Sequence, residues 1–266
     1  MRTLLRTAAV ALAAVFVLSA CDDPAIQLTY RPAVGTKTVY RLNVKTSTTT
    51  KLGDEPTTHR SESFVLRSAQ EVQAAEPGAQ TQVSVRLTGA GQEARDFEVR
   101  LDRGGQLATV ETVGGVPASA LGNLGISELL PSAAGALPSK QLRPGDRWRI
   151  NQLLRIGGAR AGRLVGFGRL ASLGVSDGTK HAVVDTEVAL PVDRTTPGEG
   201  GGTVRLTGAV RTTMHVTQRV VDGVVLAATA RSVGRYNVIL SPPTPDGGPP
   251  ITGTLVVTVT SATKAR

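Results

Sequence analysis

The longest regular pattern in the sequence lies between residues 203 and 240. Over residues 204–220, most even-numbered positions carry apolar or small side chains, with Thr212 and Gln218 as exceptions, and most odd-numbered positions carry charged or hydroxyl-bearing side chains. A period of two is typical of a β-strand with one buried and one solvated face. Asp222-Gly223 then provides a tight-turn signal, because glycine tolerates the positive φ of a hairpin. At about 3.3 Å per residue these strands would span roughly 55 Å if straight, so we expect them to bend.

Shorter runs of the same kind fill the first part of the chain. Val, Tyr and Thr are frequent in residues 36–50, and further β-type runs follow at about 62–74, 80–90, 95–103 and 106–113. A last strand is predicted for residues 251–260. Long helical periodicity is absent. The exception is residues 117–130, where apolar side chains fit either a short, glycine-weakened helix or a loop that covers the sheet and a bound ligand. These side chains are Leu121, Leu124, Ile126, Leu129 and Leu130.

A repeated stretch relates the two parts of the chain. Residues 85–90, Val-Arg-Leu-Thr-Gly-Ala, recur letter for letter as residues 204–209. Similarity at a fixed offset is the usual mark of duplication, although unrelated β-strands also resemble one another. If the halves are duplicates, Gly89 and Gly208 hold the same interior strand position, where glycine permits a bulge or a sharp bend.

We therefore predict an all-β, mainly antiparallel fold with long curved strands. Two repeated halves, residues 36–137 and 138–266, would pack as one domain, either as an open half-barrel or as a bent sandwich. At most one short helical segment is expected, near residues 117–130.

The first twenty residues have the layout of a secretory signal peptide. A basic start precedes an apolar run from Ala8 to Leu18, and small residues follow it. The run is too short for a transmembrane helix, which needs about 20 apolar residues. We expect residues 1–20 to be removed and residues 21–35 to form a tether before the β domain.

Leu18-Ser19-Ala20-Cys21 resembles the lipobox of bacterial lipoproteins, and Cys21 is the only cysteine in the chain. The resemblance implies cleavage before Cys21 and attachment of diacylglycerol to its thiol. A lipidated thiol has no catalytic or metal-binding role, and each methylene that enters the bilayer contributes about 0.8 kcal/mol to attachment. Asp22 resembles a signal for inner-membrane retention. The expected location is the outer face of the cytoplasmic membrane, with the outer membrane as the alternative.

The chain is basic, and its net formal charge falls from +9 to +7 when Arg2 and Arg6 leave with the signal peptide. The polar parity of the long hairpin predicts a basic face, which carries Arg205, Arg211, Arg219, Arg231 and Arg235. Near a membrane each such residue contributes about 1 kcal/mol of attraction to anionic headgroups. Acidic protein partners and an ordinary solvated face are the alternatives. Nucleic acid is not an expected partner of an exported protein, and aromatic residues, at 3%, are too few for base-stacking platforms.

No catalytic or metal-binding constellation is evident. The three histidines, His59, His181 and His215, lie in a polar loop, at a strand start and on a charged strand parity. No nucleophile elbow or paired-histidine zinc motif is present. We predict no catalytic residue, no metal and no cofactor, and an enzyme such as a hydrolase is the least favoured function.

Gly145-Asp146-Arg147-Trp148 resembles the Gly-Asp-x-Trp segment of β-rich exported bacterial proteins, a family without an established activity. Gly-Asp is expected to form a turn, and Trp148 to begin a strand as a core anchor. The chain also loosely resembles half-barrel lipoproteins that handle lipids in bacterial envelopes, because it combines a lipobox, long curved strands and an apolar cover. Two non-catalytic functions remain open: carriage of a lipid or other hydrophobic ligand, and presentation of a basic sheet face to an envelope partner.

Overall fold

The computed structural model describes residues 25–75, 80–89, 91, 93–105, 107–117, 137–154, 162–198, 201–243 and 248–266. Cys21, Asp22 and the five apolar residues of the expected cover (Leu121, Leu124, Ile126, Leu129 and Leu130) lie outside the described residues. Within the described part of the chain, no helix has the length and apolar character needed to cross a membrane.

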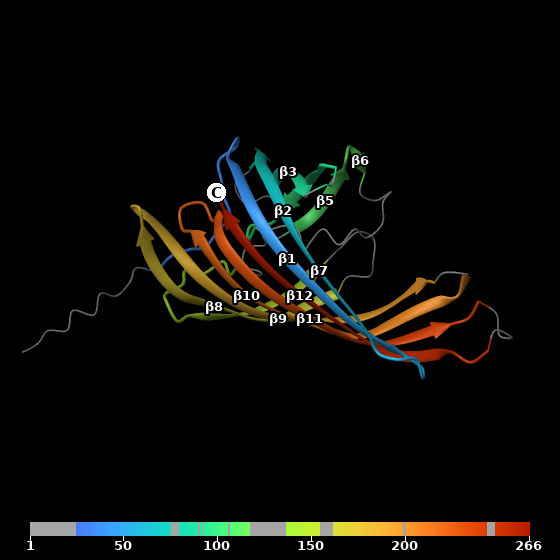
Figure 1. Cartoon of the computed structure of the whole chain (residues 1–266). Coiled ribbons are helices and arrows are strands. Elements are labelled where there is room, and N and C mark those ends of the chain that lie inside the picture. The colour runs from blue at the N-terminus through green and yellow to red at the C-terminus, as the bar shows by residue number, and fades with distance from the viewer. Residues whose placement is uncertain are drawn as a thin grey trace, which may run out of the picture.

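The described residues form twelve antiparallel strands in one unclosed sheet (Figure 1). The first six are β1 (Lys37–Leu52), β2 (Thr58–Ala74), β3 (Thr81–Gly89), β4 (Arg95–Leu101), β5 (Leu107–Val113) and β6 (Val116–Pro117). The second six are β7 (Arg147–Leu154), β8 (Gly162–Ser176), β9 (Thr179–Pro197), β10 (Thr203–Arg219), β11 (Val225–Ser241) and β12 (Ile251–Ala265). The order in the sheet is β6-β5-β4-β3-β2-β1-β12-β11-β10-β9-β8-β7. The prediction of an all-β, mainly antiparallel fold with long curved strands is confirmed. Of the two predicted forms, the single unclosed sheet fits the open half-barrel, since the described residues contain no second sheet for a sandwich.

Each group of six strands is a meander, and β1 pairs with β12 to join the two. The identical six-residue stretches do not hold equivalent places in these meanders, because residues 85–89 lie in the third strand of the first and residues 204–209 lie in the fourth strand of the second. The sequence allows a bulge or a sharp bend at Gly208, and the structure has no bulge there. Its register with β11 is continuous, and a Cβ at Gly208 would collide with the carbonyl oxygen of Arg235. Glycine at this position allows two strands to approach closely.

One face of the sheet is apolar, and we call it the inner face. On β10 it carries the even-numbered residues, and the register places Val216 opposite Val184 of β9 and Ala228 of β11. The opposite, outer face carries the odd-numbered, polar residues of β10. The alternation predicted for residues 204–220 therefore corresponds to the two faces of the sheet.

Two segments that precede the meanders lie against the inner face, and we call residues 25–36 and 137–146 together the strap. Ile26 and Leu142 exchange two backbone hydrogen bonds, of 2.8 and 2.7 Å. Leu28 and Leu142 are 1% and 0% exposed. They share one hydrophobic core with side chains from six strands, which include Tyr40, Leu42, Val44, Trp148, Ile150, Leu170, Val184, Val216 and Val225. Residues 25–35, expected as part of a tether, thus belong to the packed domain.

The strap is also fixed to the turn between β10 and β11. The backbone N–H of Arg31 donates a 2.8 Å hydrogen bond to the carbonyl oxygen of Asp222. Gly223 has a φ of 73°, and a Cβ there would collide with the carbonyl oxygen of Thr29. Glycine therefore serves both the turn and the close contact with the strap. The turn covers residues 220–224, which is longer than the predicted two-residue hairpin.

The Gly-Asp-x-Trp segment begins β7. Gly145 has a φ of 92°, and the Asp146 carboxylate accepts a 2.8 Å hydrogen bond from the backbone N–H of Arg143. Trp148 is 6% exposed, and its indole lies where a Cβ of Gly168 would stand. The predicted turn and core anchor are both confirmed.

Candidate functional site

The strap covers only one end of the inner face. Strands β1, β2 and β9 to β12 continue beyond it to three hairpin ends, which lie together at the lower right of Figure 1. Neither hydrophobic core of the described residues extends to this region. We call its inner face the open half, and the inner face beneath the strap the covered half. The apolar side chains of the open half are Leu52, Leu190, Val192, Val204, Leu206, Val210, Val238, Leu240, Ile251, Leu255 and Val257. The charged Arg194 of β9 lies on the same face, opposite Leu206.

The change from covered to open occurs along single strands. On β10, Val216 is 0% exposed, whereas Leu206 and Val210, on the same face, are half-buried. Val238 of β11 is 5% exposed and lies opposite Leu206 and Gly253 on the neighbouring strands. The open half is therefore an apolar surface whose side chains are sheltered mainly by one another.

Glycines keep the open half shallow. A Cβ on Gly234 would collide with the hydroxyl of Tyr236, and one on Gly253 would lie 2.8 Å from Cδ2 of Leu52. Tyr236 and Leu52 therefore lie along the sheet over these glycines.

The strands that border the open half have free edges. β2 pairs with β3 only from Leu66 onward, and β9 pairs with β8 only up to Ala189. The free part of β2 carries the ion pair of Arg60 with Glu62, and the free part of β9 contains Pro191. Charged side chains and proline discourage the addition of a further strand. The face between the edges is thus a better binding surface than the edges themselves.

Charge gathers on the outer face of the same strands. β1, β12, β11 and β10 are neighbours in the sheet, and they contain no Asp or Glu. Every Lys and Arg of these four strands lies on the outer face by register. These residues are Lys37, Arg41, Lys45, Lys51, Arg205, Arg211, Arg219, Arg231, Arg235 and Lys264.

Three of these basic residues have acidic partners on neighbouring elements: Lys37 with Glu71 (3.4 Å), Arg205 with Asp193 (3.2 Å) and Arg219 with Asp222 (2.7 Å). The hydrogen bonds that the Arg205 guanidinium donates to the Asp193 carboxylate raise the pKa of Arg205. The other seven form no ion pair with a described residue, and we call them the basic surface: Arg41, Lys45, Lys51, Arg211, Arg231, Arg235 and Lys264.

Of the five arginines predicted for a basic face, the structure places three in one group. Arg211 lies opposite Val233, so Arg231 and Arg235 are its diagonal neighbours on β11. Arg205 and Arg219 are partly neutralised and stand apart. The four other members of the basic surface were missed from the sequence, because the neighbours of β1 and β12 are set by pairing between distant segments.

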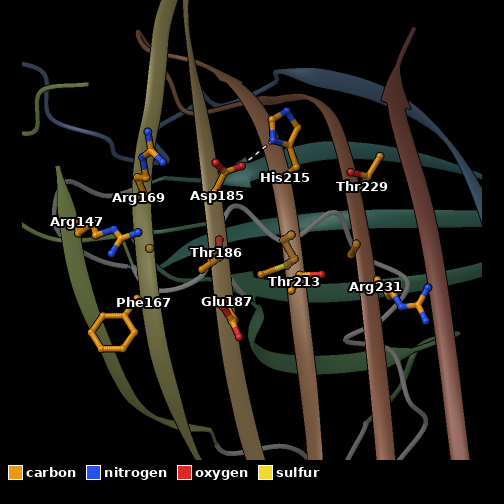
Figure 2. Close-up of a pocket in the computed structure, with 13 residues that line it drawn as sticks. Arg147, Phe167, Arg169, Asp185, Thr186, Glu187, Thr213, His215, Thr229 and Arg231 are labelled. Carbon is orange, nitrogen blue, oxygen red and sulfur yellow. Dashed lines mark hydrogen bonds and ion pairs between the residues drawn. The ribbon is translucent and has the colours of Figure 1, made fainter. Parts of the chain in front are cut away.

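An open hollow of about 620 Å³ adjoins the basic surface on the outer face. Figure 2 shows Asp185 and His215 joined across β9 and β10, with Arg169 and Thr229 on either side of them. His215 Nδ1 lies 2.7 Å from Asp185 Oδ1. Phe167, at the rim, is 61% exposed.

The hollow does not assemble a catalytic set. Asp185, His215 and Thr229 stand in one row across three strands. No hydrogen bond links Thr229 to His215 among the described contacts, so the hydroxyl lacks the base contact that activates a nucleophile. The described residues also contain no group of three His, Cys, Asp or Glu side chains that could hold a metal ion.

Tyr30 of the strap and Tyr40 of β1 both have raised pKa values. Burial, and then the negative charge of Asp222, raise the pKa of Tyr30. Burial and the neighbouring Tyr30 raise the pKa of Tyr40. These shifts come from packing of the covered half, where both rings lie against the cores.

No protein-family model matches the sequence, and no curated protein matches it either.

The candidate site consists of two surfaces of one sheet, the apolar open half on the inner face and the basic surface on the outer face.

Proposed function

We propose that this chain is a lipoprotein that binds an acyl chain of a lipid, or a similar hydrophobic ligand, on the open half. It is anchored to the outer face of the cytoplasmic membrane, or alternatively the outer membrane, through diacylglycerol on Cys21. The binding is non-catalytic and uses no cofactor. The observation that carries the proposal is the apolar open half, which lies outside both cores of the described residues.

The energetics favour such a ligand. Each methylene removed from water contributes about 0.8 kcal/mol, so ten methylenes laid on the open half contribute roughly 8 kcal/mol before the cost of ordering the chain. Contiguous apolar surfaces of this kind usually mark interaction sites. The anchor also keeps lipid close, because the four residues from Cys21 to the first described residue, Ala25, reach at most about 14 Å.

An assembly protein that presents its outer face to an acidic envelope partner is the alternative. The seven basic side chains without an acidic partner favour it. The two functions use opposite faces, so a probe placed on one face at a time distinguishes them.

Photo-cross-linking tests ligand binding in the full acylated protein, reconstituted into phosphatidylcholine vesicles at about 1 M salt with added oleate. A photoreactive amino acid at Leu206 faces the open half, and the same amino acid at the next residue, Thr207, faces outward. We expect oleate adducts from position 206 and none above background from position 207. Equal oleate labelling at both positions, or none at either, would refute the proposed function.

The anchor has a separate test. Cys21→Ser removes the thiol that would carry the lipid, so we expect the protein to leave the membrane fraction or to retain its signal peptide. Unchanged fractionation together with an unchanged mass would disprove lipidation at Cys21.

A further inference from the structure

We infer that the basic surface docks on the headgroups of an anionic phospholipid bilayer. This inference concerns the outer face, so it goes beyond the ligand proposed for the open half. It begins from an asymmetry of composition: four neighbouring strands carry ten basic residues, no acidic residue, and every charge on the same face.

The spacing of the charges indicates many anions rather than one. Arg231 and Arg235 are diagonal neighbours of Arg211, and diagonal neighbours in an antiparallel pair are about 7–8 Å apart. Lys45 and Arg231 are both paired with Thr260, so they are separated by a whole strand. All seven side chains are spread too widely over the four strands to enclose a single phosphate, and this spread suits a surface on which anionic groups repeat.

The basic surface is also large. From β1 to β10 there are three strand spacings, or about 14 Å, and from Arg41 to Lys51 the chain runs about 33 Å. The outer positions between the charges carry short hydroxyl side chains that can donate hydrogen bonds to phosphate, such as Ser47, Thr49, Thr258 and Thr260. No acidic side chain on these four strands would repel a lipid headgroup.

In the absence of a partner, part of this arrangement is unfavourable. Arg41 lies directly opposite Arg67 on β2 and Lys264 on β12, and all three are exposed. Like charges directly opposite one another in a sheet are destabilising. An anionic surface relieves this repulsion, and a bilayer is the anionic surface that an anchored protein meets continuously. Docking by the outer face leaves the open half directed away from the headgroups and accessible to ligand.

The test uses the full acylated protein reconstituted into vesicles, with a fluorophore on Asn43→Cys. Asn43 is exposed on the outer face between Arg41 and Lys45. Quenching by nitroxide-labelled lipid reports the ratio of docked to undocked protein. The vesicles contain phosphatidylcholine with or without phosphatidylglycerol. We expect strong quenching only with phosphatidylglycerol, and its loss at about 1 M salt, where the Debye length is about 3 Å.

The decisive variant neutralises three arginines at once, Arg211→Gln, Arg231→Gln and Arg235→Gln. Because each basic residue near the surface contributes about fivefold, we expect the docked-to-undocked ratio to fall roughly 100-fold. A control removes the same charge from exposed positions outside the four strands, Arg95→Gln, Lys140→Gln and Lys180→Gln, and should change the ratio by less than about twofold.

Four outcomes would overturn the inference. Equal quenching with and without phosphatidylglycerol would mean that the anchor alone sets the distance between the fluorophore at position 43 and the bilayer. An equal fall in both triple variants would show that net charge, rather than this surface, is responsible. Inorganic phosphate that abolishes quenching where sodium chloride of the same ionic strength does not would assign the surface to free phosphate. Absence of quenching on every vesicle would favour an acidic protein as the partner.

Discussion

The covered and open halves of the inner face belong to the same strands and follow the same alternation, yet their side chains have different surroundings. On β10, Val216 is fully buried and Val210 is half-buried, although both stand on the apolar parity. The difference comes from Leu28 and Leu142, which lie in the strap and not in the sheet. A period of two thus determines which face of a strand is apolar, while a distant segment determines whether that face is covered.

Replacing one leucine by alanine in each half should show the difference between the covered and open halves most clearly. Leu170 of β8 is 0% exposed in the covered half, and Leu255 of β12 is half-buried in the open half. Leu170→Ala leaves a cavity and should cost about 3 kcal/mol of unfolding free energy. Leu255→Ala leaves no enclosed cavity and should cost about 1 kcal/mol or less. Urea unfolding of the two variants provides the measurement, and equal losses would show that the open half is packed like the covered half.

Replacing a buried glutamine should have a smaller effect on the unfolding free energy, and it should raise that free energy rather than lower it. Gln218 is 0% exposed in the covered half, and neither of its amide atoms has a hydrogen-bond partner among the described residues. Leaving such groups unpaired costs about 1–3 kcal/mol. Gln218→Met, of similar size, should therefore raise the unfolding free energy by about 1–2 kcal/mol.

The control for this variant is Thr48→Val, which makes a similar polar-to-apolar change on the open half and should alter stability by less than about 0.5 kcal/mol. If Gln218→Met instead destabilises the fold, the amide is satisfied and the covered half is wetter than the account requires.

Alkaline pH provides a third test of the covered half. The pKa of Tyr30 is raised above its ordinary value of 10.0, so its contribution to stability is complete below pH 10 and is lost as the pH rises further. The loss should be about 1.4 kcal/mol for each pH unit above 10. Tyr30→Phe should lose less stability than the wild type between about pH 9 and about pH 11 in urea unfolding, by roughly 1 kcal/mol. Parallel curves for the two proteins would contradict the pKa shift.

The sequence was sufficient to predict β1 to β5, the hairpin of β10 and β11 with its faces, and β12, but not β8 or the extent of β9. The alternation over residues 204–220 predicts the polarity of β10 correctly, and the buried Trp148 agrees with its expected role. Both predictions depend on local pattern. The strap did not emerge from the sequence, because residues 25–35 have no periodicity and their packing depends on a partner more than one hundred residues away.

The basic surface could be predicted only in part for the same reason. The polar parity of one hairpin identified Arg211, Arg231 and Arg235, but Arg41 and Lys264 become their neighbours through the pairing of β1 with β12. The absence of acidic residues from β1, β10, β11 and β12 was visible in the sequence. Strand order was needed to show that these strands are adjacent.

The central claim is that one apolar face is buried at one end and accessible to ligand at the other. Single cysteines at Val210 and Val216 test it directly, because Cys21, the only native cysteine, is expected to be acylated. In the full chain reconstituted into vesicles, we measure the rate of reaction with a water-soluble maleimide, with and without added oleate. The account predicts that Val210→Cys reacts at least about tenfold faster than Val216→Cys and is slowed by oleate, since burial excludes the reagent. Equal rates at the two positions, or a rate at position 210 that oleate does not change, would contradict it.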